Sequence, residues 1–229
     1  MKDLLFDLFH TLFPDLCLAC NKLPKSKGAS FCVGCIHSMP YTEHFFIKEN
    51  TVTNHFKGRI KLYHGAAILQ FREGGIVQNM LHQLKYKGRR EIGEVMGKIA
   101  GEKMSTSPLF IRPDIIIPVP VHIKKIKKRG YNQSTIFGLA VAESLGIPFR
   151  DDILVKSVET ASQTGKSRTE RVNNVSDVFE IKDAAALQTR HVLIVDDVIT
   201  TGATLEACCI GALTGGAKQI SILCIAAVE

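Results

Sequence analysis

Two adjacent carboxylates and a run of hydroxyl residues are the part of this sequence best suited to chemistry. Asp196 and Asp197 follow four apolar residues at positions 192–195, and a Thr-Thr-Gly-Ala-Thr segment begins at Thr200. The apolar run predicts a buried strand, with the two aspartates where that strand emerges from its sheet. Residues 203–213 can continue as a helix, whose first N–H groups lack partners and lie at the positive end of its dipole. The segment between strand and helix therefore suits a phosphate group.

The carboxylates favour a different part of the same ligand. Asp196 and Asp197 repel a phosphate and only accept hydrogen bonds, so they suit sugar hydroxyls or the water shell of a metal ion. A ribose carrying a 5′-phosphate meets both requirements. The residues predicted to surround that phosphate are Thr200, Thr201, Gly202, Ala203 and Thr204. Two alternatives are weaker: a response-regulator receiver needs far more chain than the 32 residues after Asp197, and a purely structural turn leaves two carboxylates without a partner.

Four cysteines form a second candidate site near the amino terminus. They occur as two Cys-x-x-Cys pairs, Cys17 with Cys20 and Cys32 with Cys35, joined by a segment rich in Lys, Gly and Ser. Each pair places two thiolates on one tight turn, so two pairs can complete a tetrahedron around Zn²⁺. Four cysteine ligands leave no open position, which predicts a structural metal. The alternative, a disulfide or redox pair, needs an oxidising compartment that nothing in the sequence indicates.

A cationic stretch follows another predicted strand. Residues 114–117 are expected to form a strand that stops at Pro118, and most residues from 124 to 129 are Lys or Arg. Because ligands of open α/β sheets bind at the carboxyl ends of strands, this stretch is predicted to lie as a loop near Asp196. It suits either a departing pyrophosphate or a non-specific nucleic-acid contact. The residues predicted on the pyrophosphate side are Val119, Pro120, Val121, His122 and Arg129.

The elements that position these residues alternate between strand and helix. Beyond the strands already named, the sequence predicts strands at 62–71, 153–155, 175–181 and 220–228, and helices from Gly75, at 92–104 and at 134–145. This order predicts an α/β fold with a twisted, mainly parallel sheet and helices on both faces. We expect an amino-terminal helix and four-cysteine zinc module over residues 1–60 and the α/β domain over residues 61–229.

The polar segment 157–174 is too long for a simple turn in a compact domain. We therefore expect it to act as a mobile lid that closes over the site and excludes water. The lid residues predicted to contact the ligand are Gln163, Lys166, Arg168 and Arg171.

Composition limits the partners. The net charge is +7, which favours anionic partners such as pyrophosphate, nucleotides or nucleic acid. Trp is absent and only four Tyr occur, so aromatic platforms for stacking single-stranded bases are sparse. No apolar run is long enough to span a membrane. The amino terminus is apolar but broken by Asp3 and Asp7, and it lacks a secretory cleavage site, so we expect a cytoplasmic protein.

Taken together, these motifs resemble the ComF/GntX family of phosphoribosyltransferase-like proteins over nearly the whole chain. The similarity includes the four cysteines, the segments 85–89, 118–120 and 129–133, and the Asp-Asp and Thr-rich stretch, which resembles the phosphoribosyl pyrophosphate (PRPP) signature. The resemblance implies a phosphoribosyltransferase core with a zinc-ribbon-like module, PRPP bound together with Mg²⁺, and in some relatives a role in DNA uptake during natural transformation. It implies catalytic roles for Asp196 and Asp197. Acceptor or nucleic-acid contacts are expected from Lys85, Tyr86, Arg89 and Tyr131.

Three functions fit these expectations. The first is a Mg²⁺-dependent phosphoribosyltransferase that displaces pyrophosphate at the anomeric carbon, through an oxocarbenium-like transition state, for an unknown acceptor. The second is a single-stranded DNA-binding competence protein that uses the PRPP site for recognition or regulation. The third is a PRPP sensor without turnover. No general base stands out, because His122 and Asp114 are both near in sequence and neither is favoured.

Overall fold

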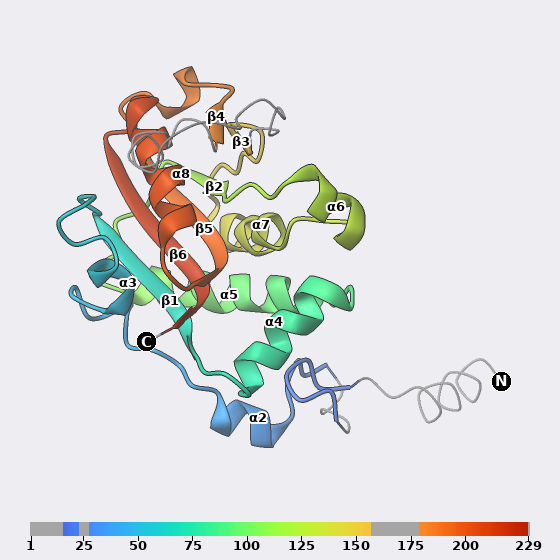
Figure 1. The fold of residues 1–229 in the computed structure, drawn as a ribbon. Helices are drawn as coiled ribbons and strands as arrows, with labels where there is room; N and C mark the ends of the chain where they lie inside the picture. Colours follow the sequence, from blue (N-terminus) through green and yellow to red (C-terminus); the bar gives the residue numbers. More distant parts are fainter. Residues whose placement is uncertain (1–15, 23–27, 157–178, 229) are drawn as a thin grey trace.

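A four-stranded parallel sheet forms the centre of the computed structural model, which describes residues 16–22, 28–156 and 179–228 (Figure 1). The strand order is β1-β6-β5-β2, and each neighbouring pair runs parallel. The strands are β1 (His64–Phe71), β2 (Ile115–Pro118), β5 (His191–Ile199) and β6 (Gln219–Val228). Their side chains are apolar on both faces, so each face must be covered, and the predicted α/β fold with a parallel sheet is confirmed.

Helices cover both faces of the sheet (Figure 1). On one face, Phe137 and Leu193 of β5 belong to the same hydrophobic cluster. On the other face, Leu205 and Ile194 of β5 belong to a second cluster. The first group comprises α4 (Ile76–Tyr86), α5 (Glu91–Thr106) and α7 (Gln133–Leu145), and the second comprises α3 (Thr51–Asn54) and α8 (Ala203–Thr214). Because consecutive strand residues point to opposite faces, Leu193 and Ile194 belong to different clusters.

The contact between α5 and α7 depends on glycines. Gly93, Gly97 and Gly101 are spaced four residues apart and lie along the side of α5 that faces α7. A Cβ atom on Gly97 would lie 2.5 Å from the Cβ of Ala140 and 2.8 Å from the carbonyl oxygen of Phe137. Neither neighbour can move without shifting the backbone of α7, so the two helices pack as closely as their backbones permit.

Two elements differ from the sequence-based prediction. The strand was expected to end before the acid pair, but β5 continues to pair with β6 as far as Ile199, opposite Ala227. The cationic stretch was expected to be a loop, but it forms helix α6 (Ile123–Arg129), with Gly130 in the left-handed conformation at its end. Lys and Arg are good helix formers, and a left-handed glycine is a common helix stop.

The remaining described elements are short. They are α2 (Val33–Ser38), the antiparallel pair β3 (Leu154–Lys156) and β4 (Phe179–Ile181), and the 3-10 helix η2 (Ala185–Leu187). Val52 and Phe56 belong to the same core cluster as residues of β5 and β6. The predicted boundary between two domains at residue 60 stays a prediction. No helix within the described ranges is long and apolar enough to cross a membrane.

Candidate functional site

The acid pair lies near the carboxyl end of β5 and has defined partners on the helices behind the sheet. Asp196 Oδ1 accepts hydrogen bonds from Ser134 Oγ and from the backbone N–H of Asp197, both at 2.8 Å. Lys85 Nζ of α4 lies 3.0 Å from Asp197 Oδ1, and both side chains are largely buried. The two aspartates are therefore held apart, one by a hydroxyl and the other by an ammonium group.

Burial gives Asp196 an unusual proton affinity. Desolvation, together with the negative charge of Asp197, raises the pKa of Asp196 to about 7, against the lowering effect of the hydrogen bond from Ser134. Near neutral pH, Asp196 is divided between a protonated form that can donate a hydrogen bond and an ionised form that only accepts. A pair of neighbouring hydroxyls on a sugar can match either form.

The Thr-rich segment closes a small cavity beside Asp196. A cavity of about 50 Å³ is lined by Asp196 and by residues 198–205. This lining includes all five residues predicted to hold a phosphate. One water needs about 10–15 Å³, so this cavity has room for a group of a few heavy atoms. The predicted residues are Thr200, Thr201, Gly202, Ala203 and Thr204.

The backbone of this segment is arranged to receive a hydrogen-bond acceptor. Gly202 has φ +76°, a left-handed conformation that glycine adopts without strain, and it precedes α8 as its N-cap. A Cβ there would lie in ordinary van der Waals contact with His55 and Phe56, at 3.5 Å from each, so the left-handed φ and not a lack of space favours glycine. Within the described residues, the backbone N–H groups of Thr200, Gly202 and Thr204 have no hydrogen-bond acceptor. These groups are open to an anion at the start of the helix.

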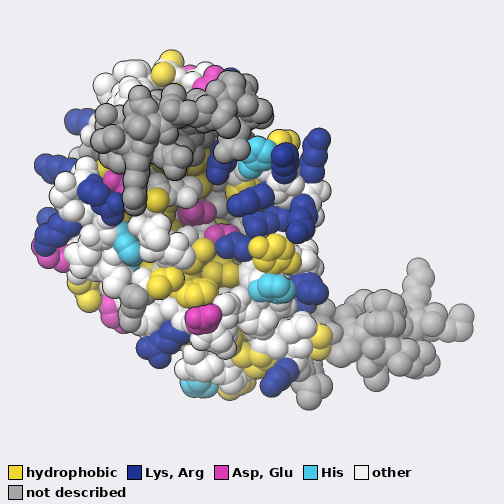
Figure 2. Space-filling model, viewed as in Figure 1, with side chains coloured by type: hydrophobic (Ala, Val, Ile, Leu, Met, Phe, Trp, Pro, Cys, Tyr) yellow, Lys and Arg dark blue, Asp and Glu magenta, His cyan; other side chains and the backbone are white. Residues whose placement is uncertain are grey.

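The predicted pyrophosphate side lies between β2 and α6. A second cavity, of about 430 Å³, is lined by Pro120, Val121, Tyr131 and residues of α6, among others. Val119 is buried, and its carbonyl accepts from Asn132 Nδ2 at 3.0 Å. His122 Nδ1 accepts from the backbone N–H of Lys124 at 3.1 Å, which caps α6. In Figure 2, acidic side chains lie near the middle of this face, and Lys and Arg side chains gather beside them over α6.

Tyr86 and Arg129 meet at the rim of this region. The Arg129 guanidinium lies 5.1 Å from the centre of the Tyr86 ring and also donates from Nη1 to Gln133 Oε1 at 2.9 Å. The His82 ring lies 5.1 Å from the ring of Tyr86 on the same helix. Tyr86 is 53% exposed, so part of its side chain stays accessible to a ligand beside Arg129 and His82.

Two of the predicted contact residues are occupied elsewhere. Tyr131 is buried under Arg90, and its hydroxyl donates to the carbonyl of Leu84. Arg89 reaches toward the cysteine region, donating to Asn21 Oδ1 and to the carbonyl of Leu16, both at 3.4 Å. Neither side chain points to the acid pair. The lid residues Gln163, Lys166, Arg168 and Arg171 lie outside the described residues.

Sequence reasoning missed the two contacts that hold the acid pair. The sequence predicts Ser134 only as the start of a helix, and Lys85 only as an acceptor or nucleic-acid contact. Asn132 caps the helix by accepting a hydrogen bond from the backbone N–H of Ser134. This cap places Ser134 in the first turn but does not indicate that its hydroxyl contacts Asp196. Both contacts join segments that are far apart in the chain, so local pattern carries no signal for them.

The four cysteines come together as predicted. The sulfur atoms of Cys17, Cys20, Cys32 and Cys35 all lie within 4.8 Å of one another, and no disulfide joins them. Zn–S bonds of about 2.3 Å in a tetrahedron require S···S distances of about 3.8 Å, and Cys20 and Cys32 are 4.0 Å apart. Burial favours the neutral thiol of Cys17, but N–H groups of Cys20, Cys32 and Ala19 outweigh it and lower its pKa to about 6. This cluster can hold a metal such as zinc.

Comparison with known proteins supports the phosphoribosyltransferase assignment. Residues 131–229 match the phosphoribosyl transferase domain family. DNA utilization protein YhgH of Salmonella typhi is 30% identical over 149 residues, and the match covers 64% of this chain and 65% of that protein. Competence protein F of Haemophilus influenzae is 36% identical over 95 residues, which cover 41% of this chain and 42% of the relative.

Among solved structures, the chain is similar to glutamine PRPP amidotransferase from B. subtilis, with 18% identity and a TM-score of 0.45. That match covers 63% of this chain and 30% of the other. The parallel sheet, the domain match and the two named relatives agree. Residues 131–229 therefore match a phosphoribosyl transferase domain, and the chain is similar to YhgH and to competence protein F over part of their length.

Proposed function

We propose that the chain binds PRPP at the carboxyl end of β5 and transfers its phosphoribosyl group to an acceptor with loss of pyrophosphate. One observation carries this proposal: the cavity beside Asp196 is lined by the complete Thr200–Thr204 segment. The 5′-phosphate occupies that cavity and accepts hydrogen bonds from the open N–H groups. The ribose hydroxyls then face Asp196 and Asp197.

The remaining groups serve the departure of pyrophosphate. The bond between ribose C1 and the pyrophosphate oxygen breaks, and its electron pair leaves with pyrophosphate while the acceptor bonds to C1. The cations of α6 neutralise the leaving group as its charge grows. Asp114 is excluded as the base, because it accepts from the backbone N–H of His191 at 2.7 Å, at the opposite end of β5. His122 Nδ1 is likewise occupied by the backbone N–H of Lys124, so we assign the acceptor's proton to solvent.

The acid pair also fits a magnesium ion. Carboxylate oxygens are the donors that Mg²⁺ prefers, so Asp196 and Asp197 can hold part of its water shell. When bound with PRPP, the ion neutralises phosphate charge during the transfer. The ion pair with Lys85 holds the Asp197 carboxylate in position.

Binding and transfer can be tested separately. Isothermal titration with PRPP and Mg²⁺ should give saturable heat with the wild-type chain and a loss of at least tenfold in affinity with Ala203→Asp. An aspartate at the first position of α8 is favourable for the helix but repels a phosphate in the cavity. Ala203→Ser is the neutral control and should bind like wild type. Equal binding by both variants would contradict the proposal, and pyrophosphate release across a panel of bases and amines tests the transfer.

A second candidate function is the binding of single-stranded DNA, which the exposure of Tyr86 beside the cations of α6 supports. A base can stack on this ring, and Arg129 and the lysines of α6 can contact the phosphates beside it. In a gel-shift series, binding should weaken steeply with salt. Tyr86→Ala should lose more affinity than Tyr41→Ala, a tyrosine that is 42% exposed and lies near Lys103 instead. Equal loss in the two variants, or no salt dependence, would exclude this function.

We also propose that the four cysteines bind a structural Zn²⁺ in an amino-terminal module that precedes the α/β domain of residues 61–229. The sulfur geometry supports the metal. Backbone N–H groups of Lys22 and Cys32 donate to Cys20 Sγ and Cys17 Sγ, at 3.4 and 3.2 Å. Such bonds stabilise thiolates around a cation, and no open coordination position is left for a reaction.

A further inference from the structure

A groove that the proposed function does not use lies in front of β1. Two cavities, of about 500 Å³ and about 450 Å³, share four lining residues and therefore adjoin. The shared residues are Lys48, Lys61, Leu62 and Tyr63. We call this space the amino-edge groove, and cavities of this size hold small organic ligands.

The amino-edge groove lies at the opposite end of the sheet from the acid pair. It is lined by His64 and Gln219, the first residues of β1 and β6. Gln219 is opposite His191 in the sheet, and Asp196 follows His191 by five residues along β5. At a rise of about 3.3 Å per residue, the two places are about 16 Å apart along the strands. A ligand in one cannot occupy the other.

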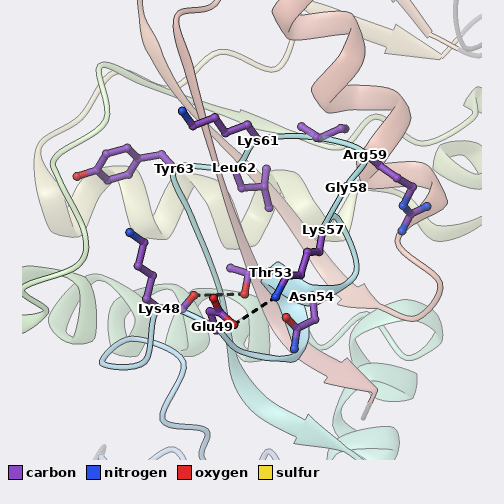
Figure 3. Close-up of a pocket in the computed structure, with 11 residues that line it drawn as sticks. Lys48, Glu49, Thr53, Asn54, Lys57, Gly58, Arg59, Lys61, Leu62 and Tyr63 are labelled. Carbon is purple, nitrogen blue, oxygen red and sulfur yellow. Dashed lines mark hydrogen bonds and ion pairs between the residues drawn. The ribbon is translucent and has the colours of Figure 1, made fainter.

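The groove is strongly cationic. Figure 3 shows Lys48, Lys57 and Lys61 arranged around Leu62, with Glu49 as the acidic residue among those drawn. Glu49 lies 3.4 Å from Lys57, and the guanidinium of Arg59 is turned to Glu206. Within the described ranges, no carboxylate lies within ion-pair distance of Lys48 or Lys61. Two ammonium groups thus face one space without an acidic partner.

The walls of the groove are apolar. Ile60, Leu62 and the ring of Tyr63 line it between the lysines. The Tyr63 ring is held in position, because its centre lies 5.2 Å from the ring of His191. Thr53 and Asn54 of α3 add polar groups at one side. The groove therefore offers apolar side chains and several positive charges to one ligand.

We propose that the amino-edge groove binds a nucleoside polyphosphate, with its base against Leu62 and Tyr63 and its phosphates at the lysines. A single inorganic anion would leave the apolar wall uncovered, and a neutral nucleoside would leave the ammonium groups unpaired. Lysine binds phosphate as a mobile point charge, which suits a flexible chain of phosphates. The site is independent of the acid pair and of the PRPP proposal.

The test uses ATP as the probe, with inorganic triphosphate and adenosine as its two halves. Titrations are performed in the Ala203→Asp background, which blocks the phosphate cavity beside Asp196, and without Mg²⁺. ATP should bind more tightly than either half. Lys48→Gln and Lys61→Gln should each weaken ATP binding about fivefold, which is the effect of one partly exposed charge contact, and the double variant about twenty-fivefold. Lys61→Arg should keep most of the affinity.

Lys98→Gln is the matched control, because Lys98 is an exposed lysine of α5 outside the groove. It removes the same charge and should leave ATP binding unchanged. Three results would overturn the proposal: no ATP binding in the Ala203→Asp background, an equal loss in Lys98→Gln and Lys61→Gln, or triphosphate binding as tightly as ATP. The last result would mean that the apolar wall contributes nothing.

Discussion

Replacing Asp196 by asparagine should stabilise the protein while it removes the proposed ribose contact. Burial raises the pKa of Asp196 from 3.8 to about 7, and each unit corresponds to about 1.36 kcal/mol. The ionised form therefore costs at most about 4 kcal/mol above pH 7. Because part of the Asp196 surface remains accessible, solvent screening reduces this figure, and we expect a gain of about 2 kcal/mol for Asp196→Asn at pH 8. Asparagine keeps an oxygen that can accept from Ser134.

The dependence on pH has a definite sign. Between about pH 4 and pH 7 the folded chain binds more protons at Asp196 than the unfolded chain, so wild-type stability from this group falls as pH rises. The advantage of Asp196→Asn should therefore grow over that range and level off above pH 7. Urea unfolding of both proteins from pH 5 to 8 measures the difference.

Asp152→Asn is the matched control for this experiment. Arg150 holds the pKa of Asp152 below its usual value through a hydrogen-bonded ion pair at the surface. The ion pair favours the ionised form, so the asparagine variant should not gain stability as pH rises. The reasoning about Asp196 would be refuted if Asp196→Asn were less stable than wild type at pH 8, or if its advantage did not change with pH.

Three further outcomes are expected. Gly97→Ala should destabilise the fold by about 1–3 kcal/mol through overpacking against α7. In the control Gly211→Ala the added Cβ meets only Leu154 at 3.7 Å, so this variant should be neutral or stabilising. The midpoints of urea unfolding compare the stability of the two variants. Burial lowers the pKa of His191, so its contribution to stability is lost as pH falls below about 6.5, and the cost of His191→Gln should shrink from pH 7.5 to pH 5. Metal analysis should find about one Zn²⁺ per chain, and Cys35→Ser should lower both that content and the melting temperature.

The strands could be predicted from sequence because their residues are apolar on both faces. Residues 192–195 and 220–228 carry that signal directly, and the structure places β5 and β6 there. The pattern failed where polar residues continue a strand: Asp196 and Asp197 read as its end, although backbone pairing with β6 extends past them. Helix α6 was missed for a related reason, since a run of lysines was interpreted by its charge and not by its helix propensity.

The assembly of the site depends on contacts that local sequence does not encode. The motif predicted which residues surround the cavity, because strand, turn and helix start are consecutive in the chain. The partners of the acid pair, Ser134 and Lys85, come from α7 and α4. Only the packing of those helices on the sheet brings them to β5. The residues that line the cavity were thus predictable from the sequence, whereas the partners of the two carboxylates were not.

The glycine contact between α5 and α7 has a consequence for the acidity of the cleft. Ser134 belongs to the first turn of α7, and the place of that helix is set by the absence of side chains at Gly93, Gly97 and Gly101. Its hydroxyl stabilises the anionic form of Asp196, together with the backbone N–H of Asp197 and the charge of Lys85. A larger residue on α5 that pushes α7 outward would withdraw that hydroxyl and leave the carboxyl group more often protonated. Proton occupancy at Asp196 is therefore governed in part by three residues that no ligand touches.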